Sequence, residues 1–305
     1  MFINNIDFSF SDINLPKEIP CIDMPGVTAK PNEGTISQSK ILLPKICELL
    51  GSIPNNDKAV ITVSGGSGVG KSTISAILSY VLNKAGIGTY VMSGDNYPLR
   101  IPGENDAERL RIFRQGGIKG LRDADMLDDE ITKGIISLQR ANEDADLKNL
   151  EKFSWFSCYL KNATRALSEY LGSPSELDFS EVCNIIENFK KGTDYVWFKK
   201  LGRTNDSLYY EKTDMRNIKI LILEWTHANS IFVKGSDIPV LLKSTPEETL
   251  KYRMERGRDA GVDSPFTTLV LGIEQKMLDS SAPFAKLILT KSGKLIDYEN
   301  YASAD

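Results

Sequence analysis

Residues 58–73 read Lys-Ala-Val-Ile-Thr-Val-Ser-Gly-Gly-Ser-Gly-Val-Gly-Lys-Ser-Thr. The short apolar run at 59–63 predicts a buried parallel strand. The pattern from Ser72 to Lys84 predicts a helix, and the glycines between the two segments predict a tight turn. This stretch therefore has the strand, turn and helix order of an α/β unit.

Four residues of this stretch match the spacing of the phosphate-binding P-loop, G-x-x-x-x-G-K-S/T: Gly65, Gly70, Lys71 and Ser72. Glycines let the backbone approach phosphate oxygens, and the loop N–H groups and the following helix N-terminus face an anion. We expect Lys71 to bring its charge to the β- and γ-phosphates and Ser72 to offer a hydroxyl ligand to Mg²⁺. The expected nucleotide-binding set in the loop is Gly65, Gly66, Ser67, Gly68, Val69, Gly70, Lys71, Ser72 and Thr73.

The composition is that of an ordinary globular protein. The chain has 305 residues, is 41% hydrophobic and 26% charged, and carries a formal net charge of -4, which gives no support for a nucleic-acid or anionic-membrane surface. No apolar run approaches the roughly 20 residues that span a bilayer, and residues 1–10 lack the features of a signal peptide. One histidine and no C-x-x-C pair argue against a zinc site, so we expect a cytoplasmic protein with free thiols.

Two carboxylates follow predicted strands. The strand at 89–92 leads to Asp95, and the apolar strand at 218–223 leads directly to Glu224. Ligands bind beyond the carboxyl ends of parallel strands, so Asp95 can face a γ-phosphate and Glu224 can occupy a Walker-B position beside Mg²⁺. The alternative for Asp95 is that it caps the next turn.

Candidate contacts to a second substrate lie near these strand ends. Besides Asp95 itself, they are Tyr97 in the same turn and Arg100, five residues after Asp95. Arg100 opens the densest basic stretch of the chain, which also holds Arg109, Arg111, Arg114, Lys119 and Arg122, although solvation alone can account for some of these. His227 lies three residues after Glu224, where a structural and a substrate-binding role are both open.

Another arginine cluster follows a helix start. Residues 245–248 match a capping box with proline at the first helical position. In the helix that follows, Arg253 and Arg256 can share one face, and Arg258 lies just beyond the expected helix end. Arginines that close over a transferring phosphoryl group would stabilise its charge in the transition state. A basic helix end that complements the helix dipole is the alternative.

The remaining segments complete the expected fold. The pattern predicts strands at 239–242 and, as an edge strand, 286–289, a β-hairpin from 195–198 and 207–210, and helices near 125–140, 144–170 and 179–191. We expect a helix at 37–50 to kink or break at Pro44, and one in the basic stretch to end at Gly116-Gly117. The predicted fold is therefore α/β, a doubly wound parallel sheet of P-loop NTPase type with an inserted helical lobe and a β-hairpin. The expected division is an N-terminal arm and helix at 1–57, a core at 58–122 and 193–305, and a helical insertion at 123–192.

Four stretches together resemble the uridine kinase/phosphoribulokinase family of P-loop kinases, which also includes pantothenate kinase. They are residues 65–72, Ser93-Gly-Asp-Asn-Tyr97, Leu221-Ile-Leu-Glu224 and residues 253–259, in the family's order. The resemblance implies ATP with Mg²⁺ and phosphorylation of a small-molecule hydroxyl. It would make Asp95 the base that accepts the hydroxyl proton and Glu224 a carboxylate on the magnesium side. It would place Arg253, Arg256 and Arg258 on the phosphates.

Two departures from the family argue against a simple uridine kinase. The helical segment lengthens the distance between the P-loop and Glu224, and Trp225 follows Glu224 where the family has glycine. The sequence therefore favours in-line phosphoryl transfer from MgATP to a metabolite such as a nucleoside or a sugar, with Lys71, Arg253 and Arg256 on the phosphates and Asp95 as base.

Other acceptors and functions stay open. The basic stretch suggests an anionic acceptor, such as a sugar phosphate or adenylyl sulfate. A regulatory or chaperone-type ATPase that acts on a protein partner is the alternative from another class. A GTPase is disfavoured because Asn83-Lys84-Ala85-Gly86 lacks the aspartate of the guanine motif. We expect a small-molecule substrate, neither a nucleic acid nor a membrane as partner, and leave a homodimer open.

Overall fold

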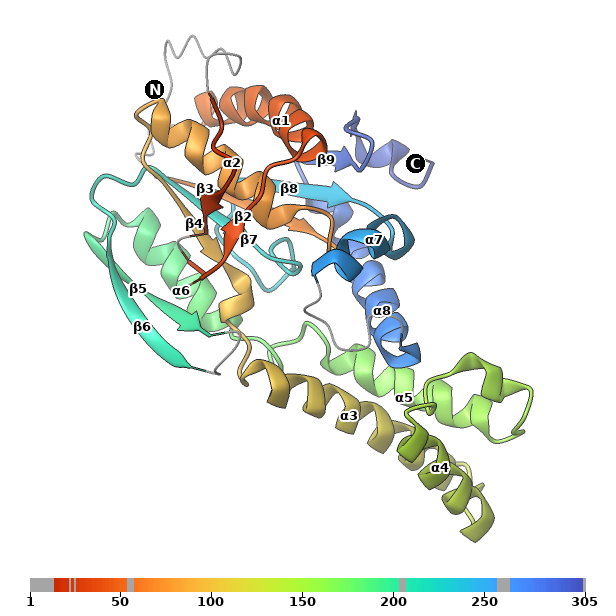
Figure 1. The fold of residues 1–305 in the computed structure, drawn as a ribbon. Helices are drawn as coiled ribbons and strands as arrows, with labels where there is room; N and C mark the ends of the chain where they lie inside the picture. Colours follow the sequence, from red (N-terminus) through yellow and green to blue (C-terminus); the bar gives the residue numbers. More distant parts are fainter. Residues whose placement is uncertain are drawn as a thin grey trace. The chain divides into compact units, whose positions relative to one another are not determined.

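A single six-stranded sheet organises the part of the chain that carries the P-loop. The computed structural model describes residues 14–21, 23–24, 26–53, 58–202, 207–256 and 264–303. Within them the sheet has the strand order β10-β9-β8-β3-β7-β4, and every neighbouring pair except β10–β9 is parallel (Figure 1). The predicted doubly wound parallel sheet is therefore confirmed.

The strands lie close to where the apolar runs predict them. Their bounds are β3 Ala59–Gly65, β4 Thr89–Ser93, β7 Ile220–Glu224, β8 Ile238–Lys243, β9 Leu287–Thr290 and β10 Leu295–Ile296. The one correction concerns β9, which was expected at the edge. The two-residue strand β10 pairs with it in antiparallel orientation and takes the edge position, after a turn at 291–293.

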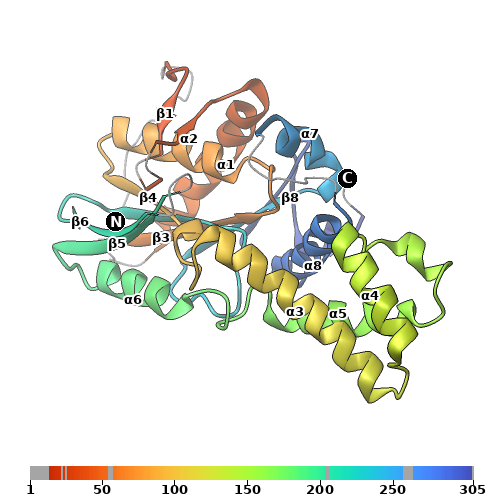
Figure 2. The same cartoon turned by 60° about the horizontal axis from the view of Figure 1, so that its bottom comes forward.

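Helices cover both faces of this sheet. Helix α1 (Glu33–Gly51) and helix α2 (Lys71–Lys84) lie on one face, and α6 (Phe179–Lys190) lies on the other (Figures 1 and 2). Alternate residues of β3 serve the two faces because strand side chains point in opposite directions. Ala59, Ile61 and Val63 belong to the core shared with α1 and α2.

Helix α1 runs through Pro44 without a break, so of the two expected effects of this proline the break is wrong and the kink stays a prediction. Proline removes one backbone hydrogen bond from a helix interior. On both sides of Pro44, Leu43 and Ile46 are almost fully buried in the sheet core. Tertiary packing of the apolar face therefore outweighs the local cost of the proline.

The chain forms two compact units. Unit 1 comprises residues 1–97, 178–252 and 277–305, and unit 2 comprises residues 98–177 and 253–276. Besides the large sheet, unit 1 contains the two-residue strands β1 (Ile19–Pro20) and β2 (Thr28–Ala29), the 3₁₀ turn η2 (Gly94–Asn96) and the antiparallel pair β5 (Tyr195–Leu201) and β6 (Leu208–Asp214). The predicted hairpin is thus confirmed, and its tip at 203–206 lies outside the described residues.

Unit 2 is helical. It contains α3 (Pro102–Asp123), α4 (Asp129–Ala141), the 3₁₀ turn η3 (Leu147–Leu150) and α5 (Phe156–Tyr170). The expectation that α3 ends at Gly116-Gly117 is wrong, because α3 continues to Asp123. A Cβ at Gly117 would lie 2.5 Å from the Tyr159 ring of α5, so the glycines allow close helix packing rather than helix termination.

Two helices connect the units. Helix α7 (Pro246–Arg256) begins in unit 1, and α8 (Pro265–Ser281) begins in unit 2. The predicted capping box at the start of α7 is present: the Thr245 N–H donates to Glu248 Oε2 at 2.7 Å, and the Glu248 N–H donates to Thr245 Oγ1 at 3.3 Å. Across the described residues, no helix has both the length and the apolar character needed to cross a bilayer.

Candidate active site

The P-loop between β3 and α2 has a backbone that only glycine adopts easily. Gly65 has φ +151° and Gly70, the N-cap of α2, has φ +111°. A Cβ at Gly65 would lie 2.7 Å from the carbonyl oxygen of Leu242 on β8. Any other residue at Gly65 would therefore push the loop away from the neighbouring strand and alter its curvature.

The Lys71 ammonium lies over the loop that it is expected to serve. Its Nζ donates to the carbonyl oxygens of Gly65 at 2.9 Å and Gly66 at 3.0 Å. The charge is thus held at the centre of the loop, where backbone N–H groups and the start of α2 favour an anion. The side chain of Val69 is buried in the core, so Val69 can serve the site only through its backbone.

Two serine hydroxyls hold the carboxylate at the end of β7. Ser72 Oγ, at the start of α2, donates to Glu224 Oε2 at 3.0 Å. Ser93 Oγ, at the end of β4, donates to Glu224 Oε1 at 2.8 Å. The parallel register produces this arrangement, because Glu224 is aligned with Ser93 on β4 and with Val63 on β3. Both oxygens of Glu224 thus have a fixed orientation.

Glu224 is a buried carboxyl with a perturbed pKa. Its exposed fraction is 2%. Burial raises the pKa of Glu224 to about 7, the negative charge of Asp95 contributes to the rise, and Lys71 opposes it. Asp95 itself is exposed in the turn η2. Asp95 and Lys71 therefore lie close enough to Glu224 for their charges to act on its carboxyl group.

The donor set at this point fits Mg²⁺. Ser72 and Glu224 supply a hydroxyl and a carboxylate oxygen, and Mg²⁺ prefers oxygen ligands. Among the described residues, no group of three or more His, Cys, Asp and Glu side chains could hold a metal ion by itself. Mg²⁺ at phosphoryl-transfer sites is held by one or two protein groups together with the substrate phosphates, so a two-residue set is sufficient.

Tyr97 does not line this site. It is fully buried, and its hydroxyl accepts a hydrogen bond from the Lys199 N–H of β5 at 3.3 Å. Burial raises the pKa of its hydroxyl. The substrate contact expected of Tyr97 is therefore corrected: the ring anchors the turn after β4 against the hairpin.

Trp225 and His227 pack beside the turn that holds Asp95. A Cβ at Gly94 would lie 2.1 Å from the Trp225 ring, so Trp225 requires glycine there. The rings of Trp225 and His227 lie 5.3 Å apart, edge to face. His227 is 8% exposed, and its predicted substrate contact stays a prediction.

The arginines expected at the site belong to unit 2 or lie outside the description. Arg100 donates to the Tyr170 hydroxyl at 2.9 Å within unit 2. Arg253 is buried at the last turn of α7 and belongs to unit 2. Arg256 ends α7, and only its backbone is described, whereas Arg258 lies outside the described residues. Their phosphate contacts therefore stay predictions.

Most of the basic stretch is neutralised by carboxylates of the same unit. Arg109 Nε donates to the buried Glu176 at 2.5 Å, and Arg114 pairs with Asp144 at 2.7 Å. Further pairs join Arg100 and Arg111 to Glu108, and Arg122 to Asp123. The sequence shows the arginines as one cluster, but the fold distributes them over separate ion pairs.

Two residues of the site region were not predicted to lie there from the sequence. Asp23 in the N-terminal arm and Lys200 on β5 form a buried ion pair beside Ser93. A signal for Lys200 was present, because it follows Val196 and Phe198 on the inward face of β5, where a charge needs a partner. Asp23 lies in an irregular segment without periodicity and gave no comparable signal.

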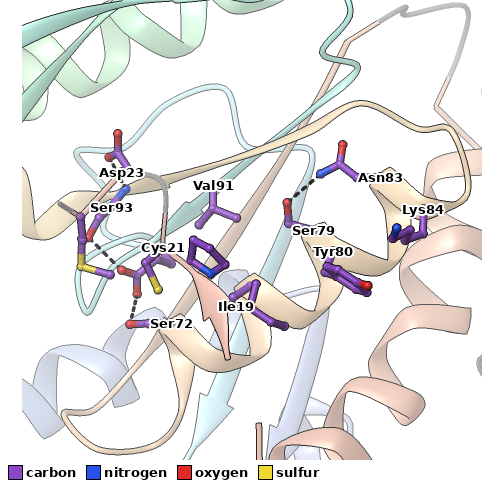
Figure 3. Close-up of a pocket in the computed structure, with 14 residues that line it drawn as sticks. Ile19, Cys21, Asp23, Ser72, Ser79, Tyr80, Asn83, Lys84, Val91 and Ser93 are labelled. Atoms are coloured by element: carbon purple, nitrogen blue, oxygen red, sulfur yellow. Dashed lines mark hydrogen bonds between the residues drawn. The ribbon is translucent and has the colours of Figure 1, made fainter. Parts of the chain in front are cut away.

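A largely apolar pocket of about 410 Å³ lies between the arm and α2 (Figure 3). Its lining includes Ser72, Ser93 and Glu224 of the candidate site, together with Ile19, Pro20, Met24, Ala76, Tyr80 and Val91. The lining also includes the polar side chains of Asp23, Ser79, Asn83 and Lys84, but most of its exposed surface is apolar, so a polyhydroxylated molecule would find few hydrogen-bonding groups there. We therefore do not place a sugar-like acceptor in this pocket.

Comparisons with known proteins match the chain to kinases. The family model for adenylylsulphate kinase matches residues 57–104, which include the P-loop and Asp95. A bifunctional α-galactosidase/sucrose kinase of Mediterraneibacter gnavus is 32% identical over 241 residues, or 79% of this chain. The chain spans about a fifth of the length of that relative, with 21% of it covered.

Among solved structures, similar chains are also described as kinases. One is provisionally assigned as a fructose transport system kinase from Silicibacter, with TM-score 0.49, 14% identity, and 80% of this chain and 94% of that chain covered. Another is D-glycerate 3-kinase from Cryptococcus neoformans, with TM-score 0.46, 8% identity, and 87% of this chain and 98% of that chain covered. The sheet order and loop geometry of this chain are those of a P-loop NTPase core. Its sequence is similar to that of a sucrose kinase-containing protein.

Proposed function

We propose that this protein is an ATP-dependent kinase that transfers the γ-phosphoryl group of MgATP to a hydroxyl of a neutral sugar. The observation that carries the proposal is the 32% identity over 241 residues to a protein named for a sucrose kinase activity. The P-loop, the held carboxylate Glu224 and the exposed carboxylate Asp95 support the same reaction type.

Of the two activities in the name of that relative, α-galactosidase and sucrose kinase, the kinase activity is the one that fits this chain. A matched span of 241 residues in a chain of 305 necessarily includes residues 65–241, and thus the P-loop. Glycoside hydrolysis uses a pair of carboxylates on either side of the scissile bond and needs no nucleotide. A P-loop with a serine next to its lysine serves nucleotide phosphates instead. The similarity therefore supports phosphoryl transfer rather than galactoside hydrolysis.

In the proposed reaction, the residues of the site either stabilise the negative charge of the phosphates or accept the proton of the attacking hydroxyl. Lys71 would leave the loop carbonyls and bind the β- and γ-phosphates. Ser72 and Glu224 would hold Mg²⁺, which neutralises charge on the phosphates when bound. Asp95 would accept the proton of the attacking hydroxyl, because its carboxyl group is exposed in the turn that follows β4. Arg253, Arg256 and Arg258 remain the predicted contacts that stabilise the transferring group.

An anionic acceptor is the second candidate, and the adenylylsulphate kinase match favours it. That match is confined to residues 57–104, the segment with the phosphate loop and the Asp95 turn. It therefore reports on nucleotide binding more than on the acceptor. The arginines that suggested an anionic substrate are paired with carboxylates inside unit 2. For these reasons a neutral sugar is the preferred acceptor.

The first test is ADP release from MgATP with a panel of acceptors. The panel contains sucrose, monosaccharides, polyols, nucleosides and sugar phosphates, with no acceptor as the background. We expect a neutral sugar to raise turnover far above the ATPase background. A panel without any stimulation, with slow steady hydrolysis, would refute the sugar kinase and favour an ATPase that acts on a protein partner.

Asp95→Asn tests the proposed base. A positioned general base contributes about 10²- to 10⁴-fold, so kcat for the sugar should fall by that order. The Kd for ATP should stay nearly unchanged because Asp95 is not part of the loop. Unaltered turnover of Asp95→Asn would remove Asp95 from the mechanism.

A further inference from the structure

The N-terminal arm and the β5–β6 hairpin meet at a buried ion pair. Lys200 Nζ of β5 donates to Asp23 Oδ1 at 2.5 Å, and the side chains are 0% and 2% exposed. Tyr90 on β4 completes the group: its hydroxyl donates to Asp23 Oδ1 at 2.8 Å and accepts from Lys200 at 3.1 Å. Two segments outside the large sheet thus place opposite charges against β4.

The other oxygen of Asp23 holds both ends of the turn that contains Asp95. Asp23 Oδ2 accepts from the Ser93 N–H at 2.7 Å and from Asn96 Nδ2 at 3.1 Å. Asn96 Nδ2 also donates to the Asp23 carbonyl at 2.8 Å. Asp95 lies between these two contacts in the sequence. The backbone that carries the proposed base is therefore fixed by a residue of the arm.

The same contacts continue to the proposed magnesium side. Ser93, whose N–H is held by Asp23, donates its hydroxyl to Glu224 Oε1 at 2.8 Å. The hairpin supports the turn as well, because the Leu201 N–H donates to Asn96 Oδ1 at 3.4 Å. One carboxylate thus fixes the backbone around Asp95 and, through Ser93, a side chain that orients Glu224.

We propose that the Asp23–Lys200 pair is a positioning device that fixes the 93–96 turn and, through Ser93, the orientation of Glu224. This inference rests on the proposed function for the roles of Asp95 and Glu224. A buried ion pair is weak evidence for stability, because well-packed apolar residues often replace it without loss. The position of the Asp23–Lys200 pair is better explained by a role in orientation. Mutation of residues that orient a metal ligand typically lowers metal affinity by about 10- to 100-fold.

The test measures nucleotide binding in the full chain, with and without the metal. Asp23→Asn combined with Lys200→Met removes both charges together and leaves no lone buried charge. The amide has one acceptor oxygen where the carboxylate has two, so it cannot hold Tyr90, Ser93 and Asn96 at once. We expect the Kd for MgADP to rise about 10-fold or more. The Kd for ADP in EDTA should change less than about 2-fold, because the P-loop contacts are untouched.

Ser93→Ala is the second variant, and it keeps the proposal testable if the double variant does not fold. It removes the hydroxyl that orients Glu224 and leaves the Asp23–Lys200 pair intact. We expect the same selective rise of the Kd for MgADP. Lys190→Met is the matched control: it breaks the Lys190–Asp237 ion pair of 2.7 Å in the same unit, and the Kd for MgADP should stay at the wild-type value.

Two results would overturn the positioning role. One is a folded double variant, judged by its melting temperature, that binds MgADP as tightly as the wild-type protein. The other is a Ser93→Ala protein with wild-type affinity for MgADP. ADP binding needs no acceptor, so these results stay distinct from a failure of the sugar kinase assay, which would refute the proposed function alone.

Discussion

At the residue scale, Glu224 links the chemistry of the site to the stability of the protein. Its pKa is raised from 4.5 to about 7, so the folded protein binds a proton that the unfolded chain has released between these pH values. The stability that protonated Glu224 contributes to the folded protein is fully present below pH 4.5 and is lost as the pH rises to about 7. Nucleotide-free protein should therefore lose stability over this window.

Glu224→Gln should remove this loss because the amide does not titrate. We expect the free energies of unfolding of the two proteins to diverge by an amount on the order of 2–3 kcal/mol between pH 4.5 and pH 7. Denaturant titrations at about five pH values measure the difference, and comparison with the variant cancels the other titrating groups. Parallel stability curves would show that the pKa of Glu224 is ordinary.

At the element scale, the contact between α3 and α5 depends on glycines inside a helix. A Cβ would lie 2.4 Å from Ala166 at Gly116, 2.5 Å from Tyr159 at Gly117, and 2.3 Å from Asn162 at Gly120. Tyr159 is 1% exposed and cannot move into open space. The glycines cost helix propensity locally, but they allow the two helices to pack closely.

Gly117→Ala should consequently destabilise unit 2, although alanine is the better helix former by about 1 kcal/mol. Overpacking against Tyr159 costs about 1–3 kcal/mol and should outweigh that gain. Gly103→Ala is the control, because Gly103 lies exposed in the same helix with nothing within 4 Å of an added Cβ. Calorimetric melting of both variants checks the prediction. A Gly117→Ala protein as stable as Gly103→Ala would contradict the close packing.

At the scale of the whole molecule, the basic stretch that suggests an anionic substrate is balanced by carboxylates of its own unit. The net charge is -4, and the arginines of α3 pair with carboxylates of unit 2. Binding of a neutral sugar should therefore respond little to salt, since no long-range attraction contributes to it.

We expect the KM for the sugar to change less than about 2-fold between about 50 mM and about 300 mM KCl, where screening of exposed charges becomes strong. The KM for MgATP, measured alongside, is the internal comparison because ATP is an anion and should bind more weakly at high salt. A KM for the acceptor that rises with salt as steeply as that of ATP would favour the anionic acceptor instead.

Much of the site could be predicted from the sequence because its signals are local. The P-loop needs glycines at fixed spacing, and Gly65 and Gly70 indeed have the backbone angles that this requires. Glu224 was predictable because an apolar strand ended in a carboxylate, and parallel register then placed it beside Ser93 of β4. Asp95 followed the same rule at β4.

What could not be predicted depends on contacts between distant residues. Gly116-Gly117 reads locally as a helix end, and only the proximity of α5 shows that it is a packing surface. Tyr97 reads as part of a binding turn, but the hairpin covers it. The arginines read as a basic cluster until the acidic residues of the folded unit neutralise them.

By itself, the sequence determined the parallel sheet, the phosphate-binding loop and the two strand-end carboxylates. Each of these depends on the periodicity or spacing of neighbouring residues, which the chain carries before it folds. Only the tertiary structure decided that Asp23 and Lys200, 177 residues apart, are partners beside Ser93. Such a pair exists because two buried opposite charges stabilise one another when folding removes both from water, and no local pattern records which charges will meet.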